Sequence, residues 1–408
     1  MVETELAGLE QAITQITREL ARQPSAEGMS YYYELASRAL DPGYLREAKA
    51  HGKKVIGIFC TLVPEELVLA SGAVPVRLCS GFGATIARTE GTFPASLCPL
   101  VKSSYGLWLS TPPIAAQCDV VAVPTTCDAK KKLAELLSDR VPVWLVQVPS
   151  TKESAESRSA WVRQIVLLKQ QLENLTGRRI SRKALRTAIT ICNQKRAALR
   201  RLYELRKEAR IWGRDALLVA DTSFYDDPVQ WTRQTDALCV EIAQSDEVKQ
   251  AAANSPRLLL TGSPVVFPTW KLPMLVEESG GIIVSDDICT GAKALWDPAY
   301  VTESSLAGML EAIGERALSI TCPCFAPSTA RLNRLVQLSR DFRVDGILYH
   351  VLRGCHLYGM EAQAAEDRFR ELDLPTLRVE TDYSLEDTEQ LRTRVEAFVE
   401  MLSARKLG

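Results

Sequence analysis

The 408-residue chain of 45.1 kDa carries 49 basic and 50 acidic side chains, which gives a formal net charge of -1. This balance argues against a surface that binds nucleic acid or an anionic membrane through bulk charge. The length and a hydrophobic content of 46% are sufficient for two or three domains with their own cores.

The N-terminal segment is acidic and amphipathic, without the basic start and apolar core of a signal peptide. Its apolar residues recur at helical spacing at Leu6, Leu9, Ile13, Ile16 and Leu20. No apolar run approaches the ~20 residues needed to cross a bilayer. We therefore expect a cytoplasmic protein whose thiols stay reduced, so that its eleven cysteines indicate metal or redox chemistry more than disulfides.

Helical patterns fill residues 1–52, with a polar break at 23–28, and an α/β pattern follows in residues 53–151. The predicted strands of this first lobe are 55–59, 74–78, 120–123 and 143–148, and the predicted helices are 64–70 and 129–137. Such alternation is typical of parallel strands covered by helices. Residues 152–254 form a charged, helical connecting segment with a corner at 174–177.

A second α/β lobe is predicted over residues 255–408. Its strands are expected at 258–261, 281–285, 345–349 and 376–380, and its helices at 268–279, 327–340, 361–372 and 385–405. The fold class is therefore α/β, with two Rossmann-like (flavodoxin-like) lobes and parallel sheets. Strand ends that face an inter-lobe cleft are the usual place for a cofactor.

Four cysteines follow predicted strands at the point where each strand leads into a helix, namely Cys60, Cys127, Cys289 and Cys355. Because the ligand crevice of an open α/β sheet lies at the carboxyl ends of its strands, these distant cysteines can converge there. The alternative is that each is a small hydrophobic residue that packs in the interior. Four at the same edge favour a shared site.

The cysteine spacings exclude several common sites. No C-x-x-C pair occurs, the only tight pair is Cys322-Pro323-Cys324, and three histidines supply a zinc site poorly. A thiolate-rich site built from remote loops favours iron–sulfur clusters over hard metals. Cys60 and Cys127 precede helices, with Asp128 as the expected N-cap, and helix N-termini favour thiolates.

Several weaker signals have a structural and a functional interpretation. Asp286 and Asp287 are acid–base candidates, although caps or ion pairs are the commoner role of such residues. Gly81-Phe82-Gly83 is half of a dinucleotide fingerprint and is better explained as a turn. No phosphate-binding P-loop motif occurs, so ATP hydrolysis would need a partner. The remaining cysteines are interpreted as packing residues: Cys79, Cys118, Cys192 and Cys239.

Short motifs along residues 30 to 402 resemble the 2-hydroxyacyl-CoA dehydratase and benzoyl-CoA reductase family in one register. They are Val63-Pro64-Glu65-Glu66-Leu67 to Leu78, Leu97-Cys98-Pro99, Thr126-Cys127-Asp128, Ser285-Asp286-Asp287-Ile288-Cys289, Cys322-Pro323-Cys324, Asp345-Gly346 to Cys355, and Glu380-Thr381-Asp382-Tyr383-Ser384. The branch with extra cysteines, the double-cubane cluster proteins, resembles this chain most.

The resemblance implies a ligand set. Cys98, Cys127 and Cys355 occupy the positions that hold a cubane throughout the family. Cys60, Cys289 and the Cys322/Cys324 pair are enough for a second cubane, which implies a double-cubane [8Fe-9S] cluster in place of one [4Fe-4S] cluster. Which of Cys322 and Cys324 is a ligand stays open.

The resemblance also implies an ATP-dependent iron–sulfur reductase component that reduces small unsaturated molecules. Its expected partner is an actin/hexokinase-like ATPase that carries its own [4Fe-4S] cluster, and the chain is expected to form a homodimer in an anaerobic setting. His356 and His350 are candidate proton donors, unless they only orient their neighbours. The alternatives are a 2-hydroxyacyl-CoA dehydratase subunit with one cubane, or a non-catalytic electron-transfer protein.

Overall fold

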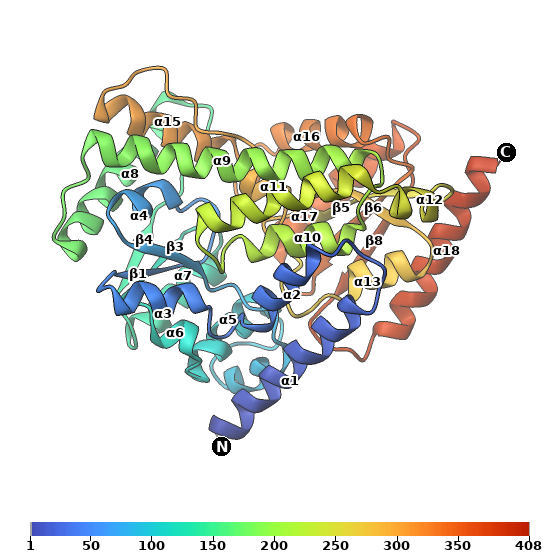
Figure 1. The fold of residues 1–408 in the computed structure, drawn as a ribbon, viewed down its shortest axis with the longest axis horizontal. Helices are drawn as coiled ribbons and strands as arrows, with labels where there is room; N and C mark the ends of the chain where they lie inside the picture. The colour runs from blue at the N-terminus through green and yellow to red at the C-terminus, as the bar shows by residue number, and fades with distance from the viewer. Residues whose placement is uncertain (1, 408) are drawn as a thin grey trace.

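Two parallel, four-stranded sheets form the frame of the molecule, of which the computed structural model describes residues 2–407 (Figure 1). The first sheet has the order β2-β1-β3-β4 and the second has the order β6-β5-β7-β8. In each sheet the chain runs to one side of its first strand and then to the other, which is a flavodoxin-like order. The predicted fold class is confirmed. The strands are β1 Val55–Ile58, β2 Val74–Arg77, β3 Val120–Pro124, β4 Val143–Val146, β5 Arg257–Gly262, β6 Ile282–Asp287, β7 Gly346–Leu352 and β8 Thr376–Thr381.

Four strands are buried along their whole length because both of their faces are covered. Every residue of β1, β3, β6 and β7 is buried. Continuous burial of this kind is typical of a parallel sheet with helices on both faces. In the first sheet, Ile58 pairs with both Arg77 of β2 and Ala122 of β3. The carboxyl ends of these three strands therefore lie at one edge.

The N-terminal region and the first lobe contain the predicted helices, with the polar break between the first two, and also three helices between residues 83 and 116 that were not predicted. Their bounds are α1 Val2–Ala21, α2 Met29–Ser37, α3 Gly43–Ala50, α4 Glu65–Ala70, η1 Gly83–Thr89, α5 Pro99–Leu109, α6 Pro113–Ala116 and α7 Asp128–Ser138. The predicted first-turn residue Pro64 lies one residue earlier, at the N-cap of α4.

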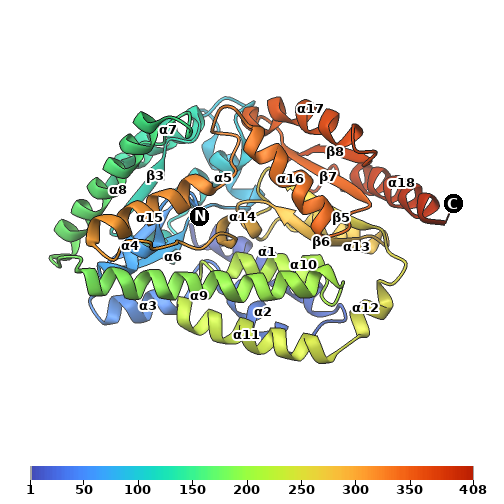
Figure 2. The same cartoon turned by 90° about the horizontal axis from the view of Figure 1, so that it is seen from above.

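The connecting segment consists of helices that reach both lobes. They are α8 Ala155–Thr176, α9 Arg182–Lys207, α10 Gly213–Thr222, α11 Pro228–Gln244 and α12 Glu247–Ala251. The predicted corner is confirmed, because Gly177 ends α8 with a φ of 66°. Figure 2 shows α9 and α11 side by side along one face of the molecule.

Ion pairs connect α9 to both lobes. Near its middle, Arg196 pairs with Glu66 of α4 at 2.5 Å. Near its end, Arg206 pairs with Asp286 of β6 at 2.7 Å, and both of these side chains are fully buried. Breaking a buried pair leaves one uncompensated charge, so each pair favours the contact of α9 with α4 of the first lobe or with β6 of the second.

The second lobe departs from the prediction in one segment. Its helices are α13 Lys271–Glu278, α14 Ala292–Leu295, α15 Leu306–Ser319, α16 Thr329–Asp341, α17 His356–Arg370 and α18 Thr388–Leu407. The helices α14 and α15 were not expected, and α15 packs against α8 beside the first sheet. Trp161 of α8 donates a hydrogen bond from its indole nitrogen to the Gly314 carbonyl at 3.0 Å.

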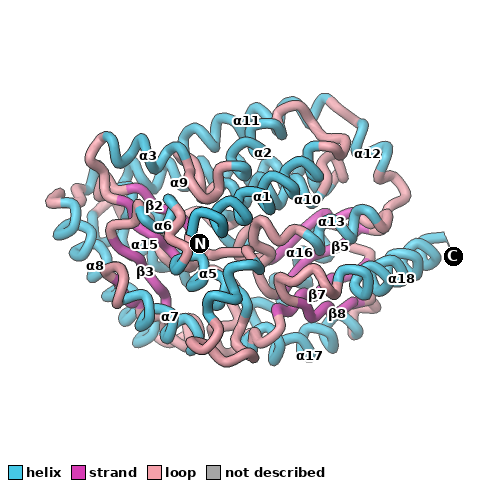
Figure 3. The backbone as a smooth tube through the Cα atoms, turned by 90° about the horizontal axis from the view of Figure 1, so that it is seen from below, coloured by secondary structure: helices cyan, strands magenta, loops and turns pink. Residues whose placement is uncertain are grey.

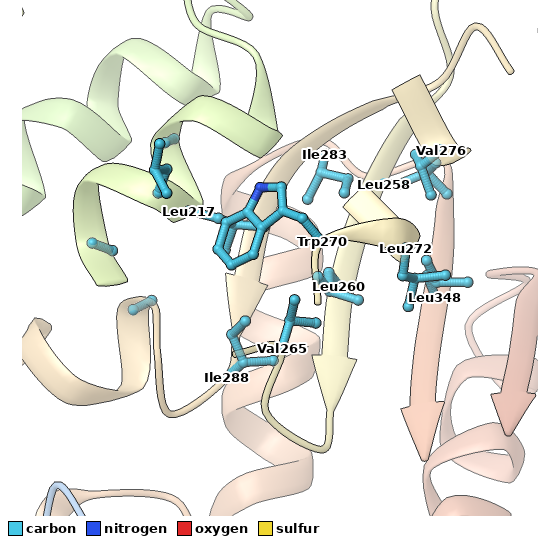
Figure 4. Close-up of a cluster of buried hydrophobic side chains, with 14 of the residues drawn as sticks. Leu217, Leu258, Leu260, Val265, Trp270, Leu272, Val276, Ile283, Ile288 and Leu348 are labelled. Carbon is cyan, nitrogen blue, oxygen red and sulfur yellow. The ribbon is translucent and has the colours of Figure 1, made fainter. Parts of the chain in front are cut away.

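Trp270 anchors the core of the second lobe (Figure 4). Its ring lies between Leu217 of α10 and the strand residues Leu258, Leu260 and Ile283. Its indole nitrogen donates to the Arg214 carbonyl at 3.1 Å. The polar tip of the ring is thus satisfied while its apolar body is buried.

The strands of the two sheets occupy separate halves of the molecule, with loops and helices between them (Figure 3). The lobes meet closely at Gly81, where a Cβ atom would lie 2.0 Å from the Val266 carbonyl oxygen. The Gly81-Phe82-Gly83 turn is thus a contact between the lobes. No helix within residues 2–407 has the length and apolarity to cross a membrane.

Candidate metal-cluster site

Three cysteines are the N-cap residues of helices. Cys98 precedes α5, Cys127 precedes α7 and Cys355 precedes α17. Burial raises the pKa of Cys127, and backbone N–H groups of the first turn of α7 oppose this only in part. The expected placement at a helix start is confirmed for Cys127, whereas Cys60 lies five residues before α4 begins at Glu65. The expected N-cap Asp128 is corrected, because Asp128 is the first residue of α7 and Cys127 is its cap.

The loops of Cys98 and Cys355 touch each other. Gly354 has a φ of 76°, and a Cβ atom there would lie 2.1 Å from the Ser96 carbonyl oxygen and 3.2 Å from the Cys98 nitrogen. A hydrogen bond between the two thiols lowers the pKa of Cys355 to about 6 and raises that of Cys98. Cys127 also interacts electrostatically with Cys355. These three residues form the first cysteine group.

The second cysteine group consists of Cys60, Cys289, Cys322 and Cys324. Cys60 follows β1, Cys289 follows β6, and the other two lie in the loop between α15 and α16. Cys60, Cys322 and Cys324 pack on the same apolar core. Burial raises the pKa of Cys289 to about 11, and Cys60 and Cys322 interact with it electrostatically. A hydrogen bond from Cys324 lowers the pKa of Cys322 to about 6.

Two lysines lie among these thiols. Lys130 of α7 donates to the Phe59 carbonyl at 2.9 Å. Burial lowers its pKa, but Cys60, Cys79, Cys127 and Cys289 outweigh burial and raise it. Because Lys130 interacts with Cys127 of the first group and with Cys60 and Cys289 of the second, the two groups are neighbours.

The second lysine, Lys293, is nearly fully buried and belongs to a charged network. It lies 3.2 Å from a carboxylate oxygen of Asp287 and donates to the Tyr358 hydroxyl at 3.1 Å. Arg331 also pairs with Asp287 and reaches Glu361 at 2.6 Å. Asp287 is therefore an ion-pair partner, the commoner of the two roles expected for it.

Asp286 likewise has a structural role. It accepts hydrogen bonds from the Ala292 backbone at 2.9 Å, from Tyr203 and from Arg206. Its side chain is completely buried, so these donors satisfy a charge that has no access to water.

The two candidate proton donors have different surroundings. His350 lies inside β7, its Nδ1 atom is 3.0 Å from the Ser263 carbonyl oxygen, and burial lowers its pKa to about 4. It is therefore neutral near pH 7, with Nδ1–H donating to that carbonyl. His356 is exposed at the first residue of α17, directly after Cys355.

The cysteines outside the expected ligand set divide into two kinds. Cys192 in α9 is buried beside Glu66 and Arg196, Cys239 in α11 is buried in the apolar core, and Cys118 packs near Gly57. Cys79 packs against the apolar core of the first lobe as expected, and it also lies in the loop after β2, where it interacts with Cys60 and Lys130. Its thiol donates to the Phe59 carbonyl at 3.4 Å.

Sequence reasoning missed Lys130, Lys293 and Tyr358. A signal existed for Lys130, which lies three residues after Cys127 and so less than one helical turn from the thiol at the helix start. The run Lys130-Lys131-Lys132 predicts a solvent-exposed helix face, so the sequence alone does not show that Lys130 points inward. Lys293 follows Cys289 by four residues in the same way.

A cavity of about 980 Å³ opens beside the first cysteine group. Ser96, Leu97 and Pro99 line it next to Cys98, and Arg353 lines it near Cys355. Other walls come from α1, η1, α13 and the segment that precedes α18. This volume is at the upper end of the range found for small-molecule and cofactor sites.

Among residues 2–407, no three His, Cys, Asp or Glu side chains are arranged to hold a single metal ion. A cluster differs from a single ion in that each thiolate binds a different iron, so its ligands lie farther apart. Seven soft sulfur donors with almost no imidazole fit iron–sulfur ligation better than any hard-metal site.

Comparison with known proteins agrees with this donor set. A family profile described as 2-hydroxyglutaryl-CoA dehydratase, D-component, matches residues 60–402. A protein of Escherichia coli (strain K12), named as dehydratase subunit YjiM, is 36% identical over 91% of this chain and 97% of its own length. The (R)-phenyllactyl-CoA dehydratase beta subunit of Clostridium sporogenes is 23% identical over 88% and 94%.

One of the benzoyl-CoA reductase subunits of Thauera aromatica is 22% identical over 79% of this chain and 84% of its own length. The relatives are thus subunits of both dehydratases and a reductase, which supports an enzymatic role. The expected resemblance is confirmed, and the chain belongs to the 2-hydroxyacyl-CoA dehydratase and benzoyl-CoA reductase family.

Proposed function

We propose that the chain is the substrate-reducing component of an ATP-dependent iron–sulfur reductase and holds a double-cubane cluster. Cys98, Cys127 and Cys355 would hold one cubane. Cys60 and Cys289, with Cys322 or Cys324, would hold the other. The observation that carries the proposal is the convergence of two cysteine groups from both lobes around Lys130.

Of the two cysteines in the tight pair, Cys322 is the better candidate ligand. Its thiol has the lowered pKa and interacts with Cys289 and Lys293, whereas the pKa of Cys324 is raised by its hydrogen bond to Cys322. A ligand must be deprotonated, so the thiol that loses its proton more readily is favoured.

When bound, the cluster would supply low-potential electrons to a small unsaturated substrate. The chain's own residues would ligate it, bury it and set its potential through charge and hydrogen bonds. His356 is exposed beside Cys355 and can exchange protons with water, so we assign proton donation to it. The neutral, buried His350 would instead position the Ser263 loop through its carbonyl.

The source of energy would be a separate actin/hexokinase-like ATPase that carries a [4Fe-4S] cluster. The chain has no P-loop motif, and its relatives are named as subunits of larger enzymes. A homodimer of this chain would meet the ATPase, as the resemblance to double-cubane proteins implies.

A dehydratase subunit with a single cubane is the second candidate. The cavity of about 980 Å³ favours it, because an acyl-CoA needs far more room than a small unsaturated molecule. Lys102, Arg353 and Arg392 line the cavity and are suitable partners for phosphates. The names of several relatives point the same way.

The test is turnover by the anaerobically reconstituted protein with the ATPase, ATP and a strong reductant. Reduction of acetylene, with no dehydration of a 2-hydroxyacyl-CoA, is the expected result. Dehydration without acetylene reduction would establish the second candidate. Bound iron with neither activity would indicate an electron carrier and contradict both.

A further inference from the structure

Three consecutive lysines lie near the start of α7, and only the first of them turns toward the cysteines. The side chains of Lys131 and Lys132 are 52% and 72% exposed, and they pair with Asp128 and Glu135 on the same helix. Lys130 is partly buried instead and donates to the carbonyl of Phe59, the residue before Cys60. Lys130 thus points inward, and the exposed Lys131 and Lys132 beside it on the same helix can serve as controls.

Lys130 also differs from its buried counterpart Lys293. Lys293 pairs with Asp287 inside a network in which Arg331 and Glu361 balance the remaining charges. Within residues 2–407, Lys130 forms no ion pair with a carboxylate. Its electrostatic partners are sulfur atoms, those of Cys60, Cys79, Cys127 and Cys289. Cys322 and Cys324 also interact with it.

A partly buried cation without a counter-charge is costly, and hydrogen bonding to one carbonyl does not neutralise it. An anion is therefore expected beside Lys130, and the side chains around it that can become anionic are thiols. Iron–sulfur clusters with thiolate ligands carry net negative charge, and that charge grows by one unit for each electron accepted.

We propose that Lys130 is a positioning residue whose ammonium group compensates the negative charge of the thiolates and of the cluster that they hold. This inference rests on the proposed function. By stabilising the more negative, reduced state, Lys130 would raise the reduction potential and make electron transfer from the ATPase easier. The step moves one electron to the cluster, and Lys130 keeps its proton throughout.

The inference is tested by removing the charge and then restoring it. Lys130→Gln and Lys130→Met remove the charge at similar length, Lys130→Arg retains it, and Lys132→Gln is the exposed control. Each protein is reconstituted anaerobically, its iron is counted, and its reduction potential is measured by a redox titration followed by electron paramagnetic resonance.

We expect the two neutral variants to show a more negative potential, or to lose iron that Lys130→Arg retains. Lys132→Gln should match the wild type. Equal reduction potentials in iron-loaded Lys130→Gln, Lys130→Met and Lys132→Gln would overturn this inference and leave the proposed function unaffected. If Lys130→Arg lost iron like the neutral variants, the inference would also be overturned, because the shape of the lysine side chain and not its charge would then be what the site requires. Absence of iron from the wild type would overturn the proposed function itself.

Discussion

Cys98, Cys127 and Cys355 differ from Cys192 in the surroundings of their thiols. The first three cap helices, and Cys192 is buried inside α9 beside Glu66 and Arg196. We expect Cys98→Ser, Cys127→Ser and Cys355→Ser each to lose roughly one cubane, about four iron atoms, because a hydroxyl is a poor ligand for iron.

The measurement is an iron count after anaerobic reconstitution, with Cys192→Ser as the matched control. The control should keep the wild-type content. If Cys192→Ser lost as much iron as Cys127→Ser, the assignment of ligands by their position at strand and helix ends would be wrong.

Cys60 and Cys289 distinguish two cubanes from one. Replacement of either by serine should remove about four iron atoms per chain and leave the circular dichroism spectrum unchanged, since each cubane needs its own thiolates. Unchanged iron in both variants would favour the dehydratase alternative with a single cluster.

At the scale of elements, α15 belongs to the second lobe by its place in the sequence but packs on α8 beside the first sheet. Trp161 of α8 is fully buried against α15. Trp161→Ala should lower the free energy of unfolding by about 3–5 kcal/mol, because it removes a large buried ring and leaves a cavity. Leu167→Ala, at a 43% exposed position of α8, is the control and should change it little. Denaturant unfolding measures both, and equal effects would contradict the packing.

The contact of α10 with α2 and α13 predicts a pH dependence. Burial raises the pKa of Asp215 from its ordinary 3.8 to about 7, and the charge of Glu277 contributes to this rise. Arg214 and a hydrogen bond from Tyr33 oppose it in part. Between these values the folded chain retains a proton that the unfolded chain has lost. Stability should therefore fall as the pH rises from about 4 to 7.

Asp215→Asn removes this contribution, so its unfolding free energy should fall less steeply across that range than that of the wild type. Asp139→Asn, at an exposed helix end, should follow the wild-type curve. Parallel curves for Asp215→Asn and the wild type, measured by denaturant unfolding at several pH values, would contradict the burial argument.

For the whole molecule, the sheets were predictable because their strands are short apolar runs between helical segments. The convergence of Cys60, Cys127, Cys289 and Cys355 followed from the same topology, since all four follow the ends of parallel strands. Cys98 follows no strand, so only the family resemblance pointed to it. The packing of α15 on α8 was not predictable, because an amphipathic pattern does not identify the partner of its apolar face.

Energy coupling is also a property of the whole molecule. With no P-loop or other nucleotide motif in its sequence, the purified chain alone should neither hydrolyse ATP nor sustain low-potential reduction. Addition of the ATPase should start turnover. Substantial ATP hydrolysis by the chain alone, measured as phosphate release, would mean that one of its own lobes binds nucleotide.

The claim that the two cysteine groups hold a double-cubane cluster is tested most directly by counting iron and acid-labile sulfide in the anaerobically reconstituted wild-type protein. Two linked cubanes predict about eight iron atoms per chain, with slightly more sulfide than iron. About four of each would contradict the double cubane and leave the second cysteine group without a cluster.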